Sequence, residues 1–312
     1  MTEVNYNSMR ICSFLPSATE ILFILGVGSQ VHAVSHECDF PREAKILPKI
    51  VRSRINSQEL TSRQIDETVS DLISKGQNIY EIDHDVLADS RPDILFTQEL
   101  CEVCAISLED VRHAAERLDV YPIIASLDPN SIADVLNDIV RVGELIGASE
   151  EAKEVVSRLE VRIRDVKLKS SQNESVTRVA CVEWLDPLMS AGHWIPDLVS
   201  TAGGSDVLAV TGSPSRRITF EELTNARPDI LIFMPCGMDI EQGREQLLSV
   251  KDKHDWENIA AVQNGRVYIC DAGSYFSRSG PRLVDGLEIL AHVIDAESFE
   301  SNQIKGVENI TL

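Results

Sequence analysis

The stretch Arg91-Pro92-Asp93-Ile94-Leu95 recurs unchanged as Arg227-Pro228-Asp229-Ile230-Leu231. In both places the Arg-Pro-Asp triplet precedes a short apolar run, and a loop that contains cysteine follows that run. Proline restricts the backbone of the residue before it, so each copy is typical of a joint between a helix and a strand. A repeat that occupies the same place in two similar patterns favours two related lobes.

Apolar runs of strand type alternate with helical runs on both sides of this repeat. Strands are predicted at residues 10–14, 31–35, 94–97, 120–125, 178–183, 218–220 and 267–270, and helices at residues 21–25 and 108–118. Ser17 or Thr19 is expected to cap the first of these helices. Strands that alternate with helices predict a parallel sheet covered on both faces. Ligands of such sheets bind beyond the carboxyl ends of the strands.

An almost unbroken helical stretch from residue 131 to residue 169 joins the two halves. Gly147 and Ala148 divide it, and Ser149 followed by two acidic residues indicates a new helix start. The sequence therefore predicts an N-terminal α/β lobe at 1–148, a linking backbone helix and linker at 149–172, and a C-terminal α/β lobe at 173–312. Two Rossmann-like lobes with parallel sheets, joined by one long helix, are expected to hold a ligand in a cleft between them.

Composition excludes several classes of function. The 312 residues carry a formal net charge of −21, which opposes binding to nucleic acid or to an anionic membrane surface. No apolar run approaches the length of a membrane span, so no membrane insertion is expected. The first ten residues lack the basic and apolar regions of a secretory signal. We therefore expect a cytoplasmic location, or an extracytoplasmic one if a leader was trimmed.

Cysteine and histidine supply candidate metal ligands. Cys101 and Cys104 have the spacing with which two thiolates reach one metal ion. His36 and Cys38 would complete a set of four if their loop meets the same edge, and such a set suits zinc or an iron-sulfur cluster. The alternative is that these cysteines are buried free thiols. His36 and His193 are also candidate axial ligands for a corrinoid cobalt or a haem iron, because neutral imidazole suits both.

The chain resembles a known family in several stretches. They are residues 10–20, residues 36–41, the two Arg-Pro-Asp strand starts, residues 202–204 and residues 278–282. In this order they resemble the cobalamin-binding, helical-backbone (class III) substrate-binding proteins of ABC import systems, which are periplasmic-binding-protein-like. The resemblance covers residues 10 to 295. It implies a corrinoid or a chelated metal held between two lobes without any chemistry on that ligand.

A flat, amphipathic corrinoid needs aromatic and aliphatic walls with a few polar groups that recognise amides. The predicted ligand-binding residues lie in loops after the strands: Pro16, Ser17, His36, Glu37, Phe40, Gln98, Glu99, Trp184, His193, Trp194, Cys236, Tyr275, Phe276 and Arg278. For Trp184 and Trp194 a role in the core remains an equal alternative, because scarce aromatic residues usually pack inside. Trp256 lies in a charged helical context and is expected to pack in the core.

The resemblance also implies docking to a transporter through one acidic residue on each lobe. Glu20 matches the first. The second is expected just before the pair Gly203-Gly204, but residues 199–202 contain no acid. This departure makes an ABC transporter partner doubtful, so carriage inside the cell is as plausible as uptake.

We therefore expect a non-catalytic binding protein that holds a cobalamin-like corrinoid. No nucleophile elbow, phosphate-binding loop, dinucleotide fingerprint or zinc protease motif is present, so no enzyme is predicted. Two alternatives remain open. One is a cytosolic metal- or iron-sulfur-binding protein that uses Cys38, Cys101 and Cys104, and the other is a binder of chelated iron or haem.

Overall fold

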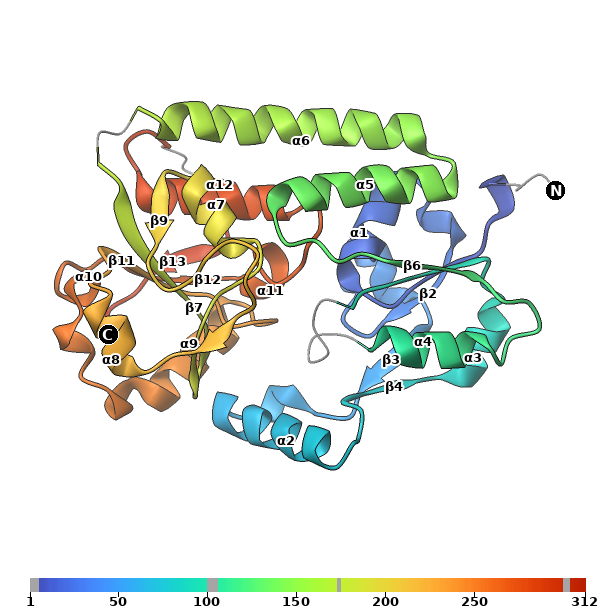
Figure 1. Cartoon of the computed structure of the whole chain (residues 1–312), viewed down its shortest axis with the longest axis horizontal. Coiled ribbons are helices and arrows are strands. Elements are labelled where there is room, and N and C mark those ends of the chain that lie inside the picture. Colours follow the sequence, from blue (N-terminus) through green and yellow to red (C-terminus); the bar gives the residue numbers. More distant parts are fainter. Residues whose placement is uncertain (1–5, 100–105, 173–174, 300–303) are drawn as a thin grey trace. The chain divides into compact units, whose positions relative to one another are not determined.

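The computed structural model describes residues 6–99, 106–172, 175–299 and 304–312. The chain forms two compact units, each around its own sheet (Figure 1). The first unit comprises Met1–Gln58, Glu67–Pro129 and Asp134–Arg158, and the second comprises Glu59–Asp66, Asn130–Ala133 and Leu159–Leu312. The expected α/β architecture with two sheets is confirmed. Two short segments from the N-terminal half of the sequence nevertheless belong to the second unit.

The sheet of the first unit has the strand order β4-β3-β2-β1-β5-β6. Its strands are β1 (Ile11–Ser13), β2 (Val31–Ser35), β3 (Lys49–Ser53), β4 (Tyr80–Ile82), β5 (Ile94–Thr97) and β6 (Ile123–Ser126). Only the β3–β4 pair is antiparallel. The predicted strands at 31–35 and 94–97 are confirmed. The strand predicted at 120–125 begins later, after Pro122, because proline has no N–H to donate to the ladder.

Helices and short 3-10 turns cover this sheet. The helices are α1 (Pro16–Ile24), α3 (His84–Ser90), α4 (Leu108–Ala115) and α5 (Ile132–Ile146), together with parts of α2 (Ser62–Ser74) and α6 (Ser149–Ser170). The 3-10 turns are Tyr6–Ser8, Gly28–Gln30, Arg42–Ile46 and Ser57–Glu59. Helix α1 begins earlier than expected, and neither Ser17 nor Thr19 caps it. Thr19 lies inside the helix, and its hydroxyl donates to Leu15 O and Ser13 Oγ.

The second sheet has the order β10-β8-β7-β11-β12-β13, with β9 also paired to β7. Its strands are β7 (Thr177–Leu185), β8 (Leu188–Ser190), β9 (Gly204–Asp206), β10 (Arg216–Arg217), β11 (Ile230–Phe233), β12 (Val267–Cys270) and β13 (Val307–Asn309). The pairs of β7 with β9 and β11, and of β11 with β12, are parallel. The strand predicted at 218–220 is wrong, because Thr219 instead caps the next helix by accepting from Glu222 N.

Helices of the second unit pack on both faces of its sheet (Figure 1). They are α7 (Ile195–Thr201), α8 (Phe220–Asn225), α9 (Ile240–Val250), α10 (Ala260–Gln263), α11 (Ala272–Tyr275) and α12 (Leu283–Ile294), with 3-10 turns at Lys251–Lys253 and Trp256–Asn258. The Phe233 and Trp256 rings meet edge to face in one core, with centroids 5.6 Å apart. The core position expected for Trp256 is thereby confirmed.

The repeated Arg-Pro-Asp triplet forms the same joint in each unit. Arg91 and Arg227 have φ values of 42° and 44° and follow the last turns of α3 and α8. The carboxylate of Asp93 accepts from Arg10 N at 2.7 Å, and that of Asp229 accepts from Arg178 N at 2.9 Å. The repeat therefore ends a helix and anchors the start of the central strand, β1 or β7. This role is structural, as the sequence comparison of the two copies suggested.

In the second sheet, one strand extends past its neighbour. Phe233, the last residue of β11, is in register with Val182, but β7 continues to Leu185 before the chain turns back into β8. The β7–β8 hairpin therefore extends past the end of the neighbouring strand. Trp184 and Asp186 lie at its tip.

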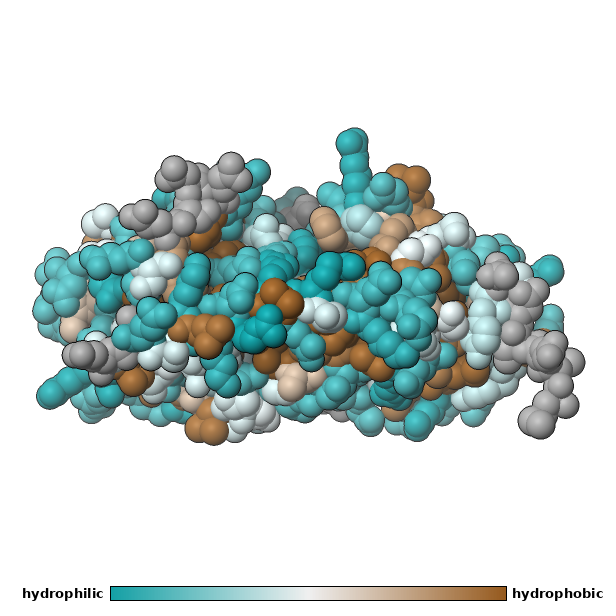
Figure 2. Space-filling view, turned by 90° about the horizontal axis from the view of Figure 1, so that it is seen from above, coloured by the Kyte–Doolittle hydropathy of each residue, from teal (hydrophilic) through white to brown (hydrophobic). Residues whose placement is uncertain are grey.

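Helix α6 is amphipathic. Ala152, Val155, Leu159 and Val166 are buried, whereas most of its other side chains are exposed. The side of the molecule seen in Figure 2 is accordingly mainly hydrophilic, with separate hydrophobic spots. Within the described residues, no helix combines the length and apolar character needed to cross a membrane.

Arg162 links α6 to α12 within the second unit. Its guanidinium donates to Glu288 Oε1 at 2.8 Å, to Glu288 Oε2 at 2.7 Å and to Asp285 Oδ1 at 2.5 Å. We expect Arg162→Ala to lower the free energy of unfolding by about 1 kcal/mol, because the network is charge-assisted but half exposed. Urea unfolding measures this, with the exposed Arg164→Ala as control. Equal effects of the two substitutions would contradict a specific role for Arg162.

Candidate ligand-binding edges

The first unit presents the carboxyl ends of four adjacent parallel strands at one edge. Strands β1, β2, β5 and β6 end in Ser13, Ser35, Thr97 and Ser126. The segments that follow carry the predicted residues: Pro16 and Ser17 form the start of α1, and His36, Glu37, Phe40, Gln98 and Glu99 lie in loops. The topology therefore places these loops along one edge of a single sheet.

The loop after β2 is held in place by Lys49 on β3. The ammonium of Lys49 donates to Cys38 O at 3.3 Å and to Ala44 O at 3.2 Å, and burial lowers its pKa. His36 keeps a quarter of its side chain exposed, and its Nε2 lies 3.2 Å from Glu37 Oε1. The contact with Glu37 does not meet hydrogen-bond geometry, so Nε2 of His36 is buried without a hydrogen bond. Phe40 is 45% exposed and offers an apolar surface.

The thiol of Cys38 belongs to a buried chain of polar groups. Its Sγ lies 3.1 Å from Thr19 Oγ1, which donates to Ser13 Oγ at 2.9 Å. Among the described residues, no group of three or more histidine, cysteine or acidic side chains could hold a metal ion. Cys101 and Cys104 lie outside the described residues. The structure therefore gives no support to the zinc or iron-sulfur hypothesis.

The described cysteines are free thiols. These are Cys12, Cys38, Cys181, Cys236 and Cys270. Burial raises the pKa of Cys12 to about 12 and also raises the pKa values of Cys181 and Cys270. Such thiols stay protonated at neutral pH and are poor nucleophiles.

Other predicted residues of the first unit differ in exposure. Glu99 is exposed, and its backbone N–H donates to Asp128 Oδ1 at 2.5 Å. Gln98 and Pro16 are half-buried, whereas Ser17 is buried. Glu20, the predicted docking acid, is only 4% exposed on α1. Its carboxylate therefore offers little surface to an arginine of another protein, and the docking role stays a prediction.

In the second unit, hydrogen bonds tie together the loops at the carboxyl ends of β7, β11 and β12. Cys236 N donates to Glu183 O at 3.0 Å, and Gly237 N donates to Ser277 Oγ at 3.0 Å. Gly273 N donates to Met238 O at 2.9 Å. The predicted residues Trp184, Cys236, Tyr275 and Arg278 lie in or beside these segments and are half-buried.

Trp194 and Phe276 are buried in this unit, with exposures of 7% and 3%. The indole N–H of Trp194 donates to Phe276 O at 2.9 Å. Neither ring offers much surface to a ligand, which favours the core alternative for Trp194. The ligand-binding role of both residues remains a prediction.

His193 precedes α7 in a left-handed conformation with φ 54°. Its backbone N–H donates to Ser213 O at 2.6 Å, and its Nδ1 is buried without a hydrogen bond. Burial lowers its pKa, so the imidazole is neutral at neutral pH. A neutral imidazole can coordinate a metal centre.

Asp206 ends β9 as a buried carboxylate. Its Oδ1 accepts from Leu208 N and Ala209 N, and its Oδ2 is buried without a hydrogen bond. Burial raises its pKa from 3.8 to about 6. Because the folded state binds the proton more tightly than the unfolded state, the stability contributed by this group is lost as pH rises through about 6.

We expect Asp206→Asn to remove this pH dependence. Between pH 5 and pH 8, the free energy of unfolding of the wild type should fall by about 1–1.5 kcal/mol more than that of the variant. Urea unfolding at the two pH values measures the difference, with the exposed Asp252→Asn as control. Parallel pH profiles of the wild type and Asp206→Asn would refute the assignment.

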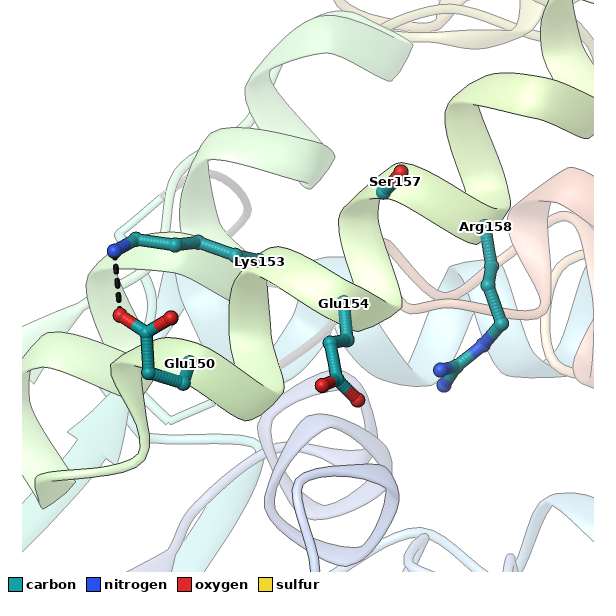
Figure 3. Close-up of a pocket in the computed structure, with 5 residues that line it drawn as sticks. All are labelled: Glu150, Lys153, Glu154, Ser157 and Arg158. Carbon is teal, nitrogen blue, oxygen red and sulfur yellow. Dashed lines mark hydrogen bonds and ion pairs between the residues drawn. The ribbon is translucent and has the colours of Figure 1, made fainter.

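A hollow of about 420 Å³ lies along α6 and is lined by Glu150, Lys153, Glu154, Ser157 and Arg158. Figure 3 shows that all five side chains come from this one helix and that Lys153 pairs with Glu150. None of them is a predicted site residue. An open, charged hollow on a single helix lacks the apolar walls that a large ligand needs.

The segment Glu59–Asp66 was not among the predicted functional residues. It belongs to the second unit, where it contacts Trp184 and Gln246. Its only sequence signal is Thr61 followed by Gln64, a capping box that marks the start of α2. That signal is local and does not reveal the partners of the segment.

Comparison with known proteins agrees with the fold. The family model described as periplasmic binding protein matches residues 11–273. The chain is 23% identical to the uncharacterized ABC transporter substrate-binding lipoprotein YvrC of Bacillus subtilis, over 93% of this chain and 81% of that protein. It is 21% identical to the vitamin B12-binding protein of Vibrio parahaemolyticus, over 82% of this chain and 83% of that protein.

A solved structure, a periplasmic heme-binding protein from Pseudomonas aeruginosa, is similar with a TM-score of 0.69 and 18% identity. The similarity covers 93% of each chain and concerns the fold. The resemblance seen in the sequence is therefore confirmed. With a family match that spans most of its length and includes the central strands of both units, the chain belongs to the periplasmic binding protein family.

Proposed function

We propose that this protein is the substrate-binding component of an ABC importer and that its ligand is a corrinoid of the vitamin B12 type, held without covalent change. The family match across residues 11–273 carries this proposal. It is supported by relatives that include an ABC transporter substrate-binding lipoprotein and a vitamin B12-binding protein.

The residues at the two edges suit such a ligand. Phe40 and Trp184 supply aromatic surface, and Gln98 and Arg278 supply polar groups beside it. A large amphipathic ring is recognised by apolar walls with a few polar groups. Each edge carries both kinds of side chain.

We expect the purified protein to bind cyanocobalamin in a 1:1 ratio with a Kd of about 1 µM or lower. Titration calorimetry, with haemin as a parallel ligand, measures the affinity and the preference. Phe40→Ala should weaken binding because it removes apolar contact area, whereas Ile46→Ala, which truncates an apolar side chain that is 86% exposed, should not. No detectable binding of any corrinoid would refute the proposed ligand.

Haem is the second candidate ligand. One of the similar solved structures is a heme-binding protein. His193, whose pKa burial lowers, and His36, which is partly exposed, each carry an imidazole that can ligate iron. Haem binding would give a Soret band that shifts in His193→Ala or His36→Ala. If both variants keep the wild-type spectrum, these histidines are not axial ligands.

The relatives argue for a transporter partner, although Glu20 is buried and residues 199–202 lack an acid. Copurification of the protein with a membrane transporter tests this partnership. Cell fractionation tests the location: a component of an importer lies outside the cytoplasm, whereas an intracellular carrier of the same ligand stays inside it.

A further inference from the structure

An eight-residue segment, Glu59–Asp66, belongs to the second unit, although its sequence neighbours on both sides belong to the first. We call it the strap. It contains the end of a 3-10 turn and the first turn of α2. Its Ser62 is only 1% exposed, so the strap is packed against the rest of the unit at this residue.

Gln246 on α9 fixes the middle of the strap. Its Oε1 accepts from Ser62 N at 2.7 Å and from Ser62 Oγ at 2.9 Å, and its Nε2 donates to Leu60 O at 3.0 Å. One amide side chain therefore satisfies two donors and one acceptor of the strap. Such a match is specific, because a buried polar group without its partner is costly.

The strap also contacts the tip of the β7–β8 hairpin. The indole N–H of Trp184 donates to Ser62 O at 3.2 Å. Arg63 donates to both carboxylate oxygens of Asp186, at 3.0 and 3.1 Å, and Lys253 donates to the same carboxylate at 2.5 Å. These contacts lower the pKa of Asp186. A bidentate arginine pair restricts orientation as well as distance.

A further ion pair holds the far end of the strap. Arg217 on β10 donates to both carboxylate oxygens of Asp66, at 2.8 and 2.9 Å. Contacts from α9, the hairpin and β10 therefore converge on the strap. Of the side chains that these hydrogen bonds join to the strap, Trp184 alone is aromatic, and it lies on the part of β7 that extends beyond β11.

We propose that the strap is a positioning element for ligand binding: through Ser62 O, and with Gln246 and Arg63 as its anchors, it holds the Trp184 indole as a preformed wall of the binding edge. This inference rests on the proposed function. A wall that is already fixed does not have to be ordered when the ligand arrives, so docking of the strap increases affinity.

The test uses the full chain with Gln246→Ala and Arg63→Ala. Each has a matched control: Glu245→Ala changes an exposed neighbour on α9, and Lys75→Ala breaks the exposed pair with Asp71 at the C-terminal end of α2. We expect both test variants to increase hydrogen exchange at residues 59–66 and to shift the Trp184 indole N–H signal in NMR spectra. The Kd for cyanocobalamin should rise about tenfold, mainly through faster dissociation.

Trp184→Phe separates the indole contact from the ring. It keeps an aromatic wall but loses the N–H donor, so its affinity should fall to a similar extent while strap exchange increases less than in Gln246→Ala. A Kd that is unchanged or tighter when the strap is released would overturn the inference. If the wild type binds neither cyanocobalamin nor haemin, the proposed function fails instead, and the indole N–H signal still reports whether the strap positions Trp184.

Discussion

Trp194→Ala is expected to lower the free energy of unfolding by about 3–5 kcal/mol. The side chain is 7% exposed, and its indole N–H donates to Phe276 O. Removal of the ring leaves a cavity in the second unit and leaves that carbonyl without its donor. Chemical denaturation followed by circular dichroism measures the loss.

This experiment also decides between the two roles considered for Trp194. Trp194→Phe keeps most of the ring and should cost about 1–2 kcal/mol, chiefly for the lost hydrogen bond. A variant Trp194→Ala that keeps wild-type stability but loses ligand affinity would show that the residue is a ligand wall. Loss of stability in both variants, in proportion to the volume removed, identifies a core residue.

Gly192→Ala is expected to lower the free energy of unfolding by about 3 kcal/mol. A Cβ atom on Gly192 would lie 2.6 Å from Pro214 C and 2.7 Å from Ser213 O. These are backbone atoms, so the loop has to shift as a whole. The shift would also break the hydrogen bond from His193 N to Ser213 O.

Gly243→Ala in α9 is the control for this substitution. Its Cβ would meet Ile269 Cδ1 at 3.0 Å, which is the movable end of a side chain. Alanine also favours a helix over glycine, so the net change should stay within about 1 kcal/mol. Equal losses for Gly192→Ala and Gly243→Ala would contradict the backbone clash at Gly192. Thermal unfolding of both variants under one condition makes the comparison.

The elements that sequence patterns predicted best are those whose residues depend on nearby neighbours. Strands 31–35 and 94–97 are short apolar runs bounded by polar or proline-containing segments, and the helix start at Ser149 has its own acidic turn. The run at 218–220 resembles a strand because Ile218 and Phe220 alternate with a polar residue. Thr219 carries the capping box instead, and this local hydrogen bonding outweighs the alternation.

The site was less predictable because its partners are distant in the sequence. The alternating pattern locates the loops after the strands and so predicts Phe40 and Cys236 as edge residues, whereas Trp184 lies inside β7, which is longer than the strand predicted at 178–183. The same pattern does not predict which of these side chains are buried. Trp194 and Phe276 come after the strands β8 and β12, but their packing depends on elements that the local pattern does not reveal. No local sequence pattern marks Gln246 as a functional residue, because its role depends on Ser62 from the other half of the chain.

The path of the chain has a practical consequence for dissection of the molecule. The second unit takes in residues 59–66 and 130–133, so no continuous stretch of sequence encodes it alone. A fragment that starts at Leu159 would lack the partner of Gln246 and one of the two cations that face Asp186. Expression of the second unit alone, for example in a split reporter, would therefore need residues 59–66 from another source. They could be added as a separate peptide or joined to the unit by circular permutation.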